Sequence, residues 1–200
     1  MYLDDVPLVQ VKQCKYLGVI LSDNRDLGQD IDRVMDAFLK QFYATYGKFK
    51  FCDQNVLCYL FRTYTSSFYG IELWVEKIKR FQMEKISVAY HKAVKKVCQL
   101  NVWDSNHVAC EIAGVRTFKH LLAKRWVSLW HRICGNASPC LANLKYYFRY
   151  FGLITGKIDS LIRERYNVDI GQNPACAIYS RIIYVEKHEP RSNYVYRDIE

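Results

Sequence analysis

The chain of 200 residues is half hydrophobic and 24% charged, with a mean hydropathy of −0.18. These values exclude an intrinsically disordered chain and predict a globular protein with one sizeable core or two small cores in contact. No apolar run approaches the roughly eighteen residues of a membrane span. The N-terminus also lacks the pattern of a secretory signal, so we expect an intracellular protein, nuclear or cytoplasmic, with no membrane contact.

The excess of positive charge is the most informative part of the composition. Lys and Arg number 29 against 20 Asp and Glu, which gives a net charge of +9 and an isoelectric point near 9.1. Such an excess is typical of a protein that contacts a polyanion, and nucleic acid is the first candidate. An unspecialised basic surface has the same charge, so composition alone leaves both interpretations open.

The start of the chain predicts a β-hairpin. Leu8–Val11 forms one expected strand and Tyr16–Leu21 the other, with turns at Asp4–Asp5 and at Lys12–Gln13. Gly18 inside the second strand indicates a bulge, or a place where another backbone comes close. Because two strands alone are marginal in water, we expect the hairpin to lie on another element.

The hairpin contains a sequence that resembles a metal-binding motif. Tyr2-Leu3-Asp4-Asp5 matches the Tyr-x-Asp-Asp pattern that holds metal-binding aspartates in polymerases. A two-metal site needs several carboxylates on a rigid sheet, and no buried strand leads into these residues. Since Val6-Pro7 follows, we interpret the two aspartates as turn residues.

A series of helices follows the hairpin, each predicted from apolar residues that recur at three and four positions. The expected helices are Asp30–Phe49, a second capped by Asp53 and reaching Phe68, Lys77–Leu100, a short one capped by Asp104 and ended by Gly114, and Phe118–Cys134 capped by Thr117. The short loop between the first two predicts an antiparallel helical pair. Further helices are expected at Cys140–Tyr150 and Lys157–Arg165, and Ile178–Val185 fits either a strand or a helix.

Three lysines of the third helix share one face. At about 100° per residue, Lys85, Lys92 and Lys96 fall within roughly 40° of one another. A lysine stripe is often a solvated helix face. In a chain with this net charge, the same stripe also fits contact with phosphates.

No complete active site can be assembled from the sequence. It lacks a glycine-rich phosphate loop and a Gly-x-Ser-x-Gly motif, so we predict no catalytic residue and no metal ligand. The eight cysteines form no Cys-x-x-Cys pair and are expected to be reduced and mostly buried. A zinc set remains a weaker alternative, drawn from His107, Cys110, His120, His131, Cys134 and Cys140.

Several short motifs, taken in order, resemble the reverse transcriptases of non-LTR (LINE-type) retrotransposons. Lys15-Tyr16-Leu17-Gly18-Val19-Ile20-Leu21 resembles the primer-grip strand of that family. Phe68-Tyr69-Gly70-Ile71-Glu72-Leu73-Trp74 is similar to the signature that closes the thumb helices. The similarity covers roughly residues 1–135, and the order and spacing of the motifs make the set more specific than any one member.

The resemblance implies a fold and a division into domains. The expected fold is mainly α, with an N-terminal β-hairpin followed by a thumb-like helical bundle and further helices. A primer-grip-like hairpin would span residues 1–26 and a thumb-like bundle residues 27–103. A weakly defined helical region would span residues 104–200.

The resemblance also implies what this chain would bind and what it would lack. The parent family is an RNA-directed DNA polymerase that uses Mg²⁺, but its catalytic aspartates lie upstream of the matching hairpin. We therefore expect a fragment of a transposable-element protein without the catalytic palm, without a cofactor and without activity alone.

The implied nucleic-acid-binding residues are Lys15, Tyr16, Leu17 and Gly18 near a primer end, and Lys85, Lys92 and Lys96 for sequence-independent contact with an RNA/DNA template–primer. The alternatives are a protein-interaction module, which would associate with other chains through an exposed hairpin edge, and a non-functional gene product.

Overall fold

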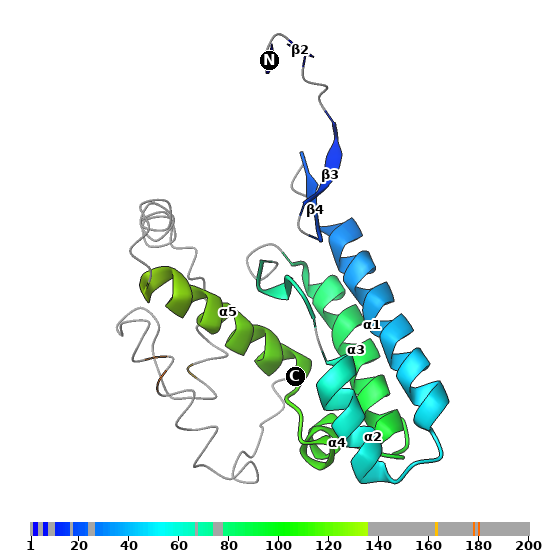
Figure 1. Cartoon of the computed structure of the whole chain (residues 1–200). Coiled ribbons are helices and arrows are strands. Elements are labelled where there is room, and N and C mark those ends of the chain that lie inside the picture. The colour runs from blue at the N-terminus through cyan, green and yellow to red at the C-terminus, as the bar shows by residue number, and fades with distance from the viewer. Residues whose placement is uncertain are drawn as a thin grey trace.

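The computed structural model describes residues 2–3, 6–7, 11–16, 18–23, 27–66, 68–73 and 78–135, and the single positions 163, 178 and 180. Within these residues the chain is mainly α-helical, with short antiparallel strands ahead of a helical bundle, as the sequence predicts (Figure 1). None of the helices in the described ranges combines the length and apolar character that crossing a bilayer requires.

The elements follow one another in a simple order. The strands are β1 (Tyr2–Leu3), β2 (Val6–Pro7), β3 (Gln13–Tyr16) and β4 (Val19–Ser22). The helices are α1 (Gly28–Phe49), α2 (Gln54–Leu60), α3 (Arg80–Val97), α4 (Asn106–Ala113) and α5 (Phe118–Gly135), with a π-helical turn η1 (Phe61–Thr65) and a 3-10 turn η2 (Ile71–Leu73) between α2 and α3. The expected helices at Cys140–Tyr150 and Lys157–Arg165 lie outside the described residues, apart from the single helical position Arg163.

The hairpin is tighter than the sequence predicts. β3 and β4 pair antiparallel with Tyr16 opposite Val19, so that only two residues separate the strands. The predicted continuous strand Tyr16–Leu21 is therefore wrong. The chain reverses at Gly18, whose φ of +83° costs glycine little but would strain other residues. Lys12–Gln13, predicted as a turn, leads into β3 instead.

Ahead of this hairpin lies a second, smaller strand pair. β1 pairs antiparallel with β2, with Leu3 opposite Val6. Asp4 and Asp5 stand between these strands in sequence but lie outside the described residues. The predicted strand Leu8–Val11 is not supported at Val11, which belongs to no strand, and its other residues are not described.

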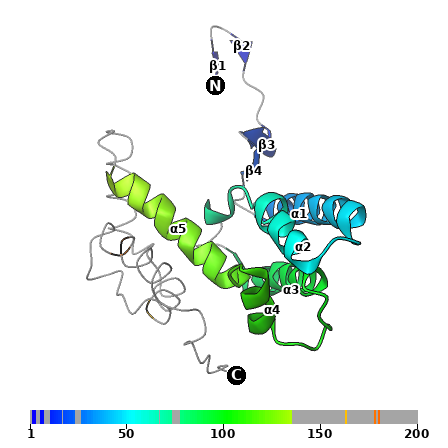
Figure 2. The ribbon, with the colours of Figure 1, turned by 60° about the horizontal axis from the view of Figure 1, so that its bottom comes forward.

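The first three helices, α1, α2 and α3, form a bundle (Figure 2). α2 and η1 run back along α1, which confirms the predicted antiparallel pair: Phe42 near the end of α1 packs against Phe61, and Phe38 packs against Phe68 further along. Asp53 caps α2 as predicted, because its carboxylate accepts a hydrogen bond from the Asn55 N–H at 2.8 Å.

The remaining helices close the bundle. α4 packs on α3, and α5 leads away from the bundle after crossing α3 and η2 (Figures 1 and 2). Ser105 rather than Asp104 caps α4, since its hydroxyl accepts from the His107 N–H at 3.2 Å, while Asp104 accepts from the Asn101 N–H at 2.6 Å. Gly114 ends α4 in the left-handed region, as predicted.

One buried carboxylate ties the hairpin to the bundle. Asp30, in the first turn of α1, is 1% exposed, and its Oδ1 accepts hydrogen bonds from the Ile20 N–H at 3.0 Å and from Arg33 Nε at 2.8 Å. A second contact lies at the hairpin turn, where the Tyr69 ring and the side chain of Val19 approach Gly18 and Gly70. The hairpin therefore rests on α1 and on the Tyr69–Gly70 turn.

Three buried cysteines meet where α2, α3 and α4 converge. Cys58 Sγ lies 4.0 Å from Cys98 Sγ, and Cys98 Sγ donates to the Ala109 carbonyl at 3.4 Å. Burial raises the pKa of the Cys98 and Cys110 thiols to about 12 and also raises the pKa of Cys58. All three are free thiols in the core, as the sequence predicts, whereas Cys14 on β3 is exposed.

Substitution of Asp30 tests the link between hairpin and bundle. In Asp30→Ala the Ile20 N–H and Arg33 lose their acceptor, so we expect unfolding free energy to fall by about 1–3 kcal/mol. Urea unfolding and amide exchange at Ile20 measure the loss. Asp36→Ala, an exposed position on the same helix, is the matched control. Unchanged exchange at Ile20 in Asp30→Ala would contradict this link.

The cysteines differ in expected reactivity. At about pH 8 the raised pKa values keep Cys98 and Cys110 protonated and unreactive in the folded protein. Mass spectrometry after brief iodoacetamide treatment should find Cys14 alkylated and Cys58, Cys98 and Cys110 unmodified until denaturant is added. Rapid alkylation of these three in the native protein would contradict their placement in the core.

Candidate nucleic-acid interface

A groove lies along the packed surface of α1 and α3. Its volume is about 300 Å³. Apolar side chains form its floor, and Lys85, Lys92 and Lys96 stand along the α3 side. The three predicted lysines therefore line a single groove. The lining residues are Met35, Leu39, Phe42, Tyr43, Lys85, Val88, Ala89, Lys92, Ala93 and Lys96.

α1 and α3 run parallel along this groove. Lys85 near the start of α3 meets Asp32 near the start of α1, and Lys96 near the end of α3 meets Tyr46 near the end of α1. From Lys85 to Lys96, the first and last lining residues of α3, the helix rises about 16 Å along the groove. The hairpin lies at the Lys85 end, since Ile20 bonds to Asp30 in the first turn of α1.

Lys96 stands between two aromatic rings of α1. Its Nζ lies 5.3 Å from the ring centre of Tyr43 and 4.9 Å from that of Tyr46. Cation–aromatic contacts of this length orient an ammonium group without neutralising its charge. Lys96 is therefore held at the edge of the groove with its charge open to an anion.

Lys85 has a different role from the other two lysines. Its Nζ lies 3.1 Å from Asp32 Oδ1, and both side chains are more than half exposed. This exposed pair adds little stability, but the carboxylate cancels the charge that Lys85 would offer a phosphate. Within the part of the chain that the structure describes, Lys92 makes no ion pair, so the cationic end of the groove is that of Lys92 and Lys96.

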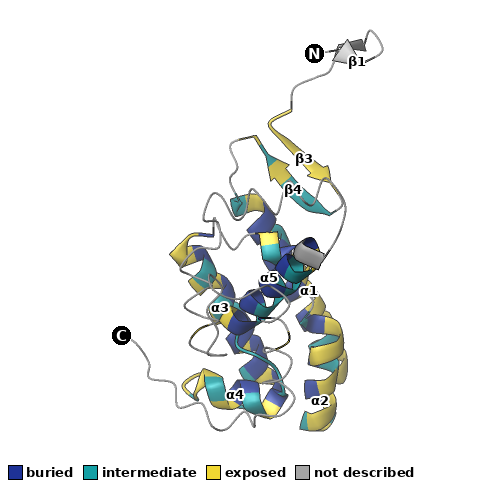
Figure 3. Cartoon of the chain, turned by 90° about the vertical axis from the view of Figure 1, so that its left-hand side faces the viewer, coloured by how far each residue is buried: buried dark blue, intermediate teal, exposed yellow. Residues whose placement is uncertain are grey.

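The predicted primer-grip residues lie apart from these lysines. Lys15 and Tyr16 are exposed on β3, and Gly18 forms the hairpin turn at the opposite end of α1 from Lys96. Leu17 lies outside the described residues. β3 is exposed along its whole length (Figure 3). The structure thus brings together the α3 lysines, but not the hairpin residues with Lys92 and Lys96.

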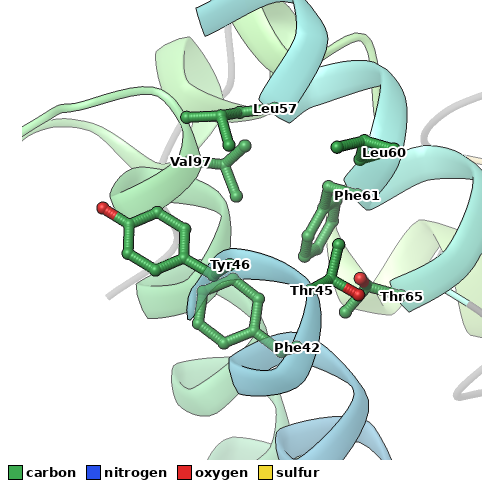
Figure 4. A pocket seen from close by; sticks show the side chains of 8 residues that line it. All are labelled: Phe42, Thr45, Tyr46, Leu57, Leu60, Phe61, Thr65 and Val97. Carbon is green, nitrogen blue, oxygen red and sulfur yellow. The ribbon is translucent and has the colours of Figure 1, made fainter. Parts of the chain in front are cut away.

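A second cavity, between α1, α2 and α3, is too small for a ligand. Its volume is about 10 Å³, roughly that of one water molecule. Figure 4 shows its lining by the largely apolar side chains of Phe42, Thr45, Tyr46, Leu57, Leu60, Phe61, Thr65 and Val97. It is a packing defect in the core and not a binding site.

The described residues supply no metal centre. Among them, no three His, Cys, Asp or Glu side chains are grouped so that they could hold a metal ion. The zinc alternative therefore gains no support from His107, Cys110, His120 and His131, and the side chains of Cys134 and Cys140 are not described.

His91 is a buried titratable side chain on α3, the helix that carries the three lysines. It is 8% exposed, and its Nδ1 lies 3.3 Å from the Ser87 hydroxyl. Burial, and to a smaller extent the positive charges of Lys95 and Lys119, lower the pKa of His91 to about 4. His91 is therefore neutral near pH 7 and adds no charge to the α3 surface.

Sequence reasoning missed the partners that α1 contributes. Tyr43 and Asp32 were not singled out, although Leu39, Tyr43 and Tyr46 fall within about 60° of one another when α1 is projected at 100° per residue. The same projection that found the lysine stripe on α3 could have found this aromatic face. That the two faces meet follows only from the packing of the helices.

His91 makes stability depend on pH. The unfolded state binds a proton near pH 6.5 and the folded state only near pH 4, so stability falls as pH drops through this window. From about pH 7 to pH 5 we expect His91 to account for a loss of about 2 kcal/mol in unfolding free energy.

Urea unfolding at the two pH values measures the loss. The His91→Gln variant should show a correspondingly smaller loss. An identical pH dependence in His91→Gln would contradict the assignment.

Comparisons with known proteins leave the chain without an assigned family: no family model, no curated protein and no solved structure matches it.

Proposed function

We propose that this chain is a nucleic-acid-binding module of the non-LTR reverse-transcriptase type, which binds an RNA/DNA template–primer through its thumb-like bundle. The single observation that supports it best is the groove between α1 and α3, where Lys92 and Lys96 stand beside Tyr43. A net charge of +9 supports the same class of ligand.

The sequence resemblance adds a second argument. Two motifs that suggest the family, Lys15–Leu21 and Phe68–Trp74, are far apart in sequence, yet their glycines lie close together. A side chain at Gly18 would meet the Tyr69 ring at 3.5 Å, and one at Gly70 would meet Val19 at 3.4 Å. Two motifs of one family are expected to pack together when they belong to one structural unit. Their contact therefore supports the proposal that both derive from the same family.

The same surface suits contact with phosphates better than catalysis. Lysine ammonium groups bind phosphate oxygens as point charges and read no sequence, so binding is expected to be independent of sequence and sensitive to salt. The proposal therefore assigns binding to this chain and leaves polymerisation to a palm domain.

A protein-interaction module is the second candidate. Within the described residues β3 pairs with β4 alone and leaves its outer edge open, and Tyr16 is 63% exposed. Open strand edges pair readily with other chains. Sedimentation analysis separates the two candidates. A chain that stays monomeric at all concentrations argues against the protein-interaction module.

Paired lysine substitutions test the proposed function. Lys92→Ala/Lys96→Ala should weaken binding to a template–primer oligonucleotide by about tenfold and reduce the slope of log affinity against log salt by ~2, because two phosphate contacts are lost. Lys85→Ala should weaken binding less than Lys92→Ala alone or Lys96→Ala alone, since Asp32 already pairs with Lys85.

Fluorescence anisotropy between about 50 and 200 mM salt measures both quantities. Lys119→Ala/Arg132→Ala, which removes the same charge from exposed positions of α5, is the matched control. Absence of binding at low salt, or equal losses in the two double variants, would refute the assignment to the groove.

A further inference from the structure

The cationic end of the groove continues along α1 in a second cation–aromatic pair. Lys50 Nζ lies 4.8 Å from the ring centre of Phe51, directly after α1. Lys50 follows Tyr43 by seven residues, which places it on the same face of α1 and about 10 Å further along. We call Lys92, Lys96, Tyr43, Lys50 and Phe51 the aromatic track.

The rings of this track are open to solvent. Tyr43 is 57% exposed and Phe51 is 89% exposed, in a chain whose core has buried many other aromatic side chains. Exposed rings beside lysines are what single-strand binding surfaces use, because bases stack on the rings while the ammonium groups hold the backbone. A double helix offers no free base faces, so it would leave these rings unused.

The size and lining of the groove also favour a single-stranded ligand. Its volume of about 300 Å³ is at the lower limit of small-ligand pockets, and its floor is apolar. A rigid duplex presents phosphates to such a surface and cannot reach the floor. An unpaired base can lie against its apolar lining, which includes Met35, Leu39 and Val88.

The two ends of the groove differ in charge. At one end Asp32 pairs with Lys85, and Asp36 is exposed one turn further on, so that end offers phosphates little net positive charge. At the other end Lys92 and Lys96 are one turn apart, about 6 Å along the axis, and can serve successive phosphates of one strand. The strand would therefore lie from Lys92 toward Phe51.

We infer that the aromatic track binds an unpaired segment of RNA or DNA, with bases stacked on Tyr43 and Phe51 and phosphates at Lys92, Lys96 and Lys50. This inference rests on the proposed function and makes it more specific, because it names the single-stranded part of a template–primer as the ligand of the groove. The double-stranded part of the template–primer would then contact the protein outside this groove.

The test compares a single-stranded oligonucleotide of about twelve nucleotides with the duplex of the same length. Anisotropy titrations should show tighter binding of the single strand by the unsubstituted chain. Tyr43→Leu/Phe51→Leu should weaken single-strand binding by about fivefold or more and weaken duplex binding less, because leucine keeps the apolar surface but not the ring on which a base stacks.

Tyr43→Phe should retain single-strand binding, since the ring remains. Tyr59→Leu/Tyr64→Leu, at exposed positions in α2 and η1, is the matched control and should bind like the unsubstituted chain. Thermal unfolding confirms that each variant is folded.

The outcomes separate the two proposals. If duplex binds as tightly as the single strand, and only the lysine variant loses affinity, the inference is wrong while the proposed function stands. If neither ligand binds at low salt, both are wrong. A loss in Tyr43→Leu/Phe51→Leu that is larger for the single strand than for the duplex supports both.

Discussion

The packing of Tyr90 among phenylalanine rings determines how α1 and α3 meet, and the groove depends on it. The Tyr90 ring centre lies 5.8 to 6.2 Å from those of Phe38, Phe61, Phe68 and Phe118, so one side chain joins α1, η1, α3 and α5. Its hydroxyl donates to the Arg116 carbonyl at 2.8 Å, which satisfies the only polar atom that the side chain brings into the core. Because these contacts fix which faces of α1 and α3 are buried, Lys92 and Lys96 stand beside the exposed face of α1.

Much of the fold follows from local patterns. Apolar residues at three- and four-residue spacing predicted α1, α3 and α5, and Asp53 and Gly114 predicted where α2 begins and α4 ends. The hairpin was harder to predict, because Gly18 fits both a bulge inside a strand and a turn between strands. A register that depends on one glycine φ angle and on the contact with Tyr69 cannot be read from strand propensity.

The site was predictable only as far as it lies on one helix. Lys85, Lys92 and Lys96 share a face of α3, and sequence spacing is enough to show this. Their different environments come from α1, which supplies a carboxylate to Lys85 and aromatic rings to Lys96. Such partners are 50 or more positions away in sequence, so their chemistry appears only when the bundle is assembled.

The most direct test of the account is to map where an unpaired oligonucleotide contacts the protein. In an NMR titration of the isotope-labelled chain, we expect amide shift changes along residues 39–51 and 85–96, with little change in the hairpin at 13–22 or along α5. Shift changes that leave α1 and α3 unaffected and concentrate in the hairpin or on α5 would contradict the claim that the groove holds nucleic acid.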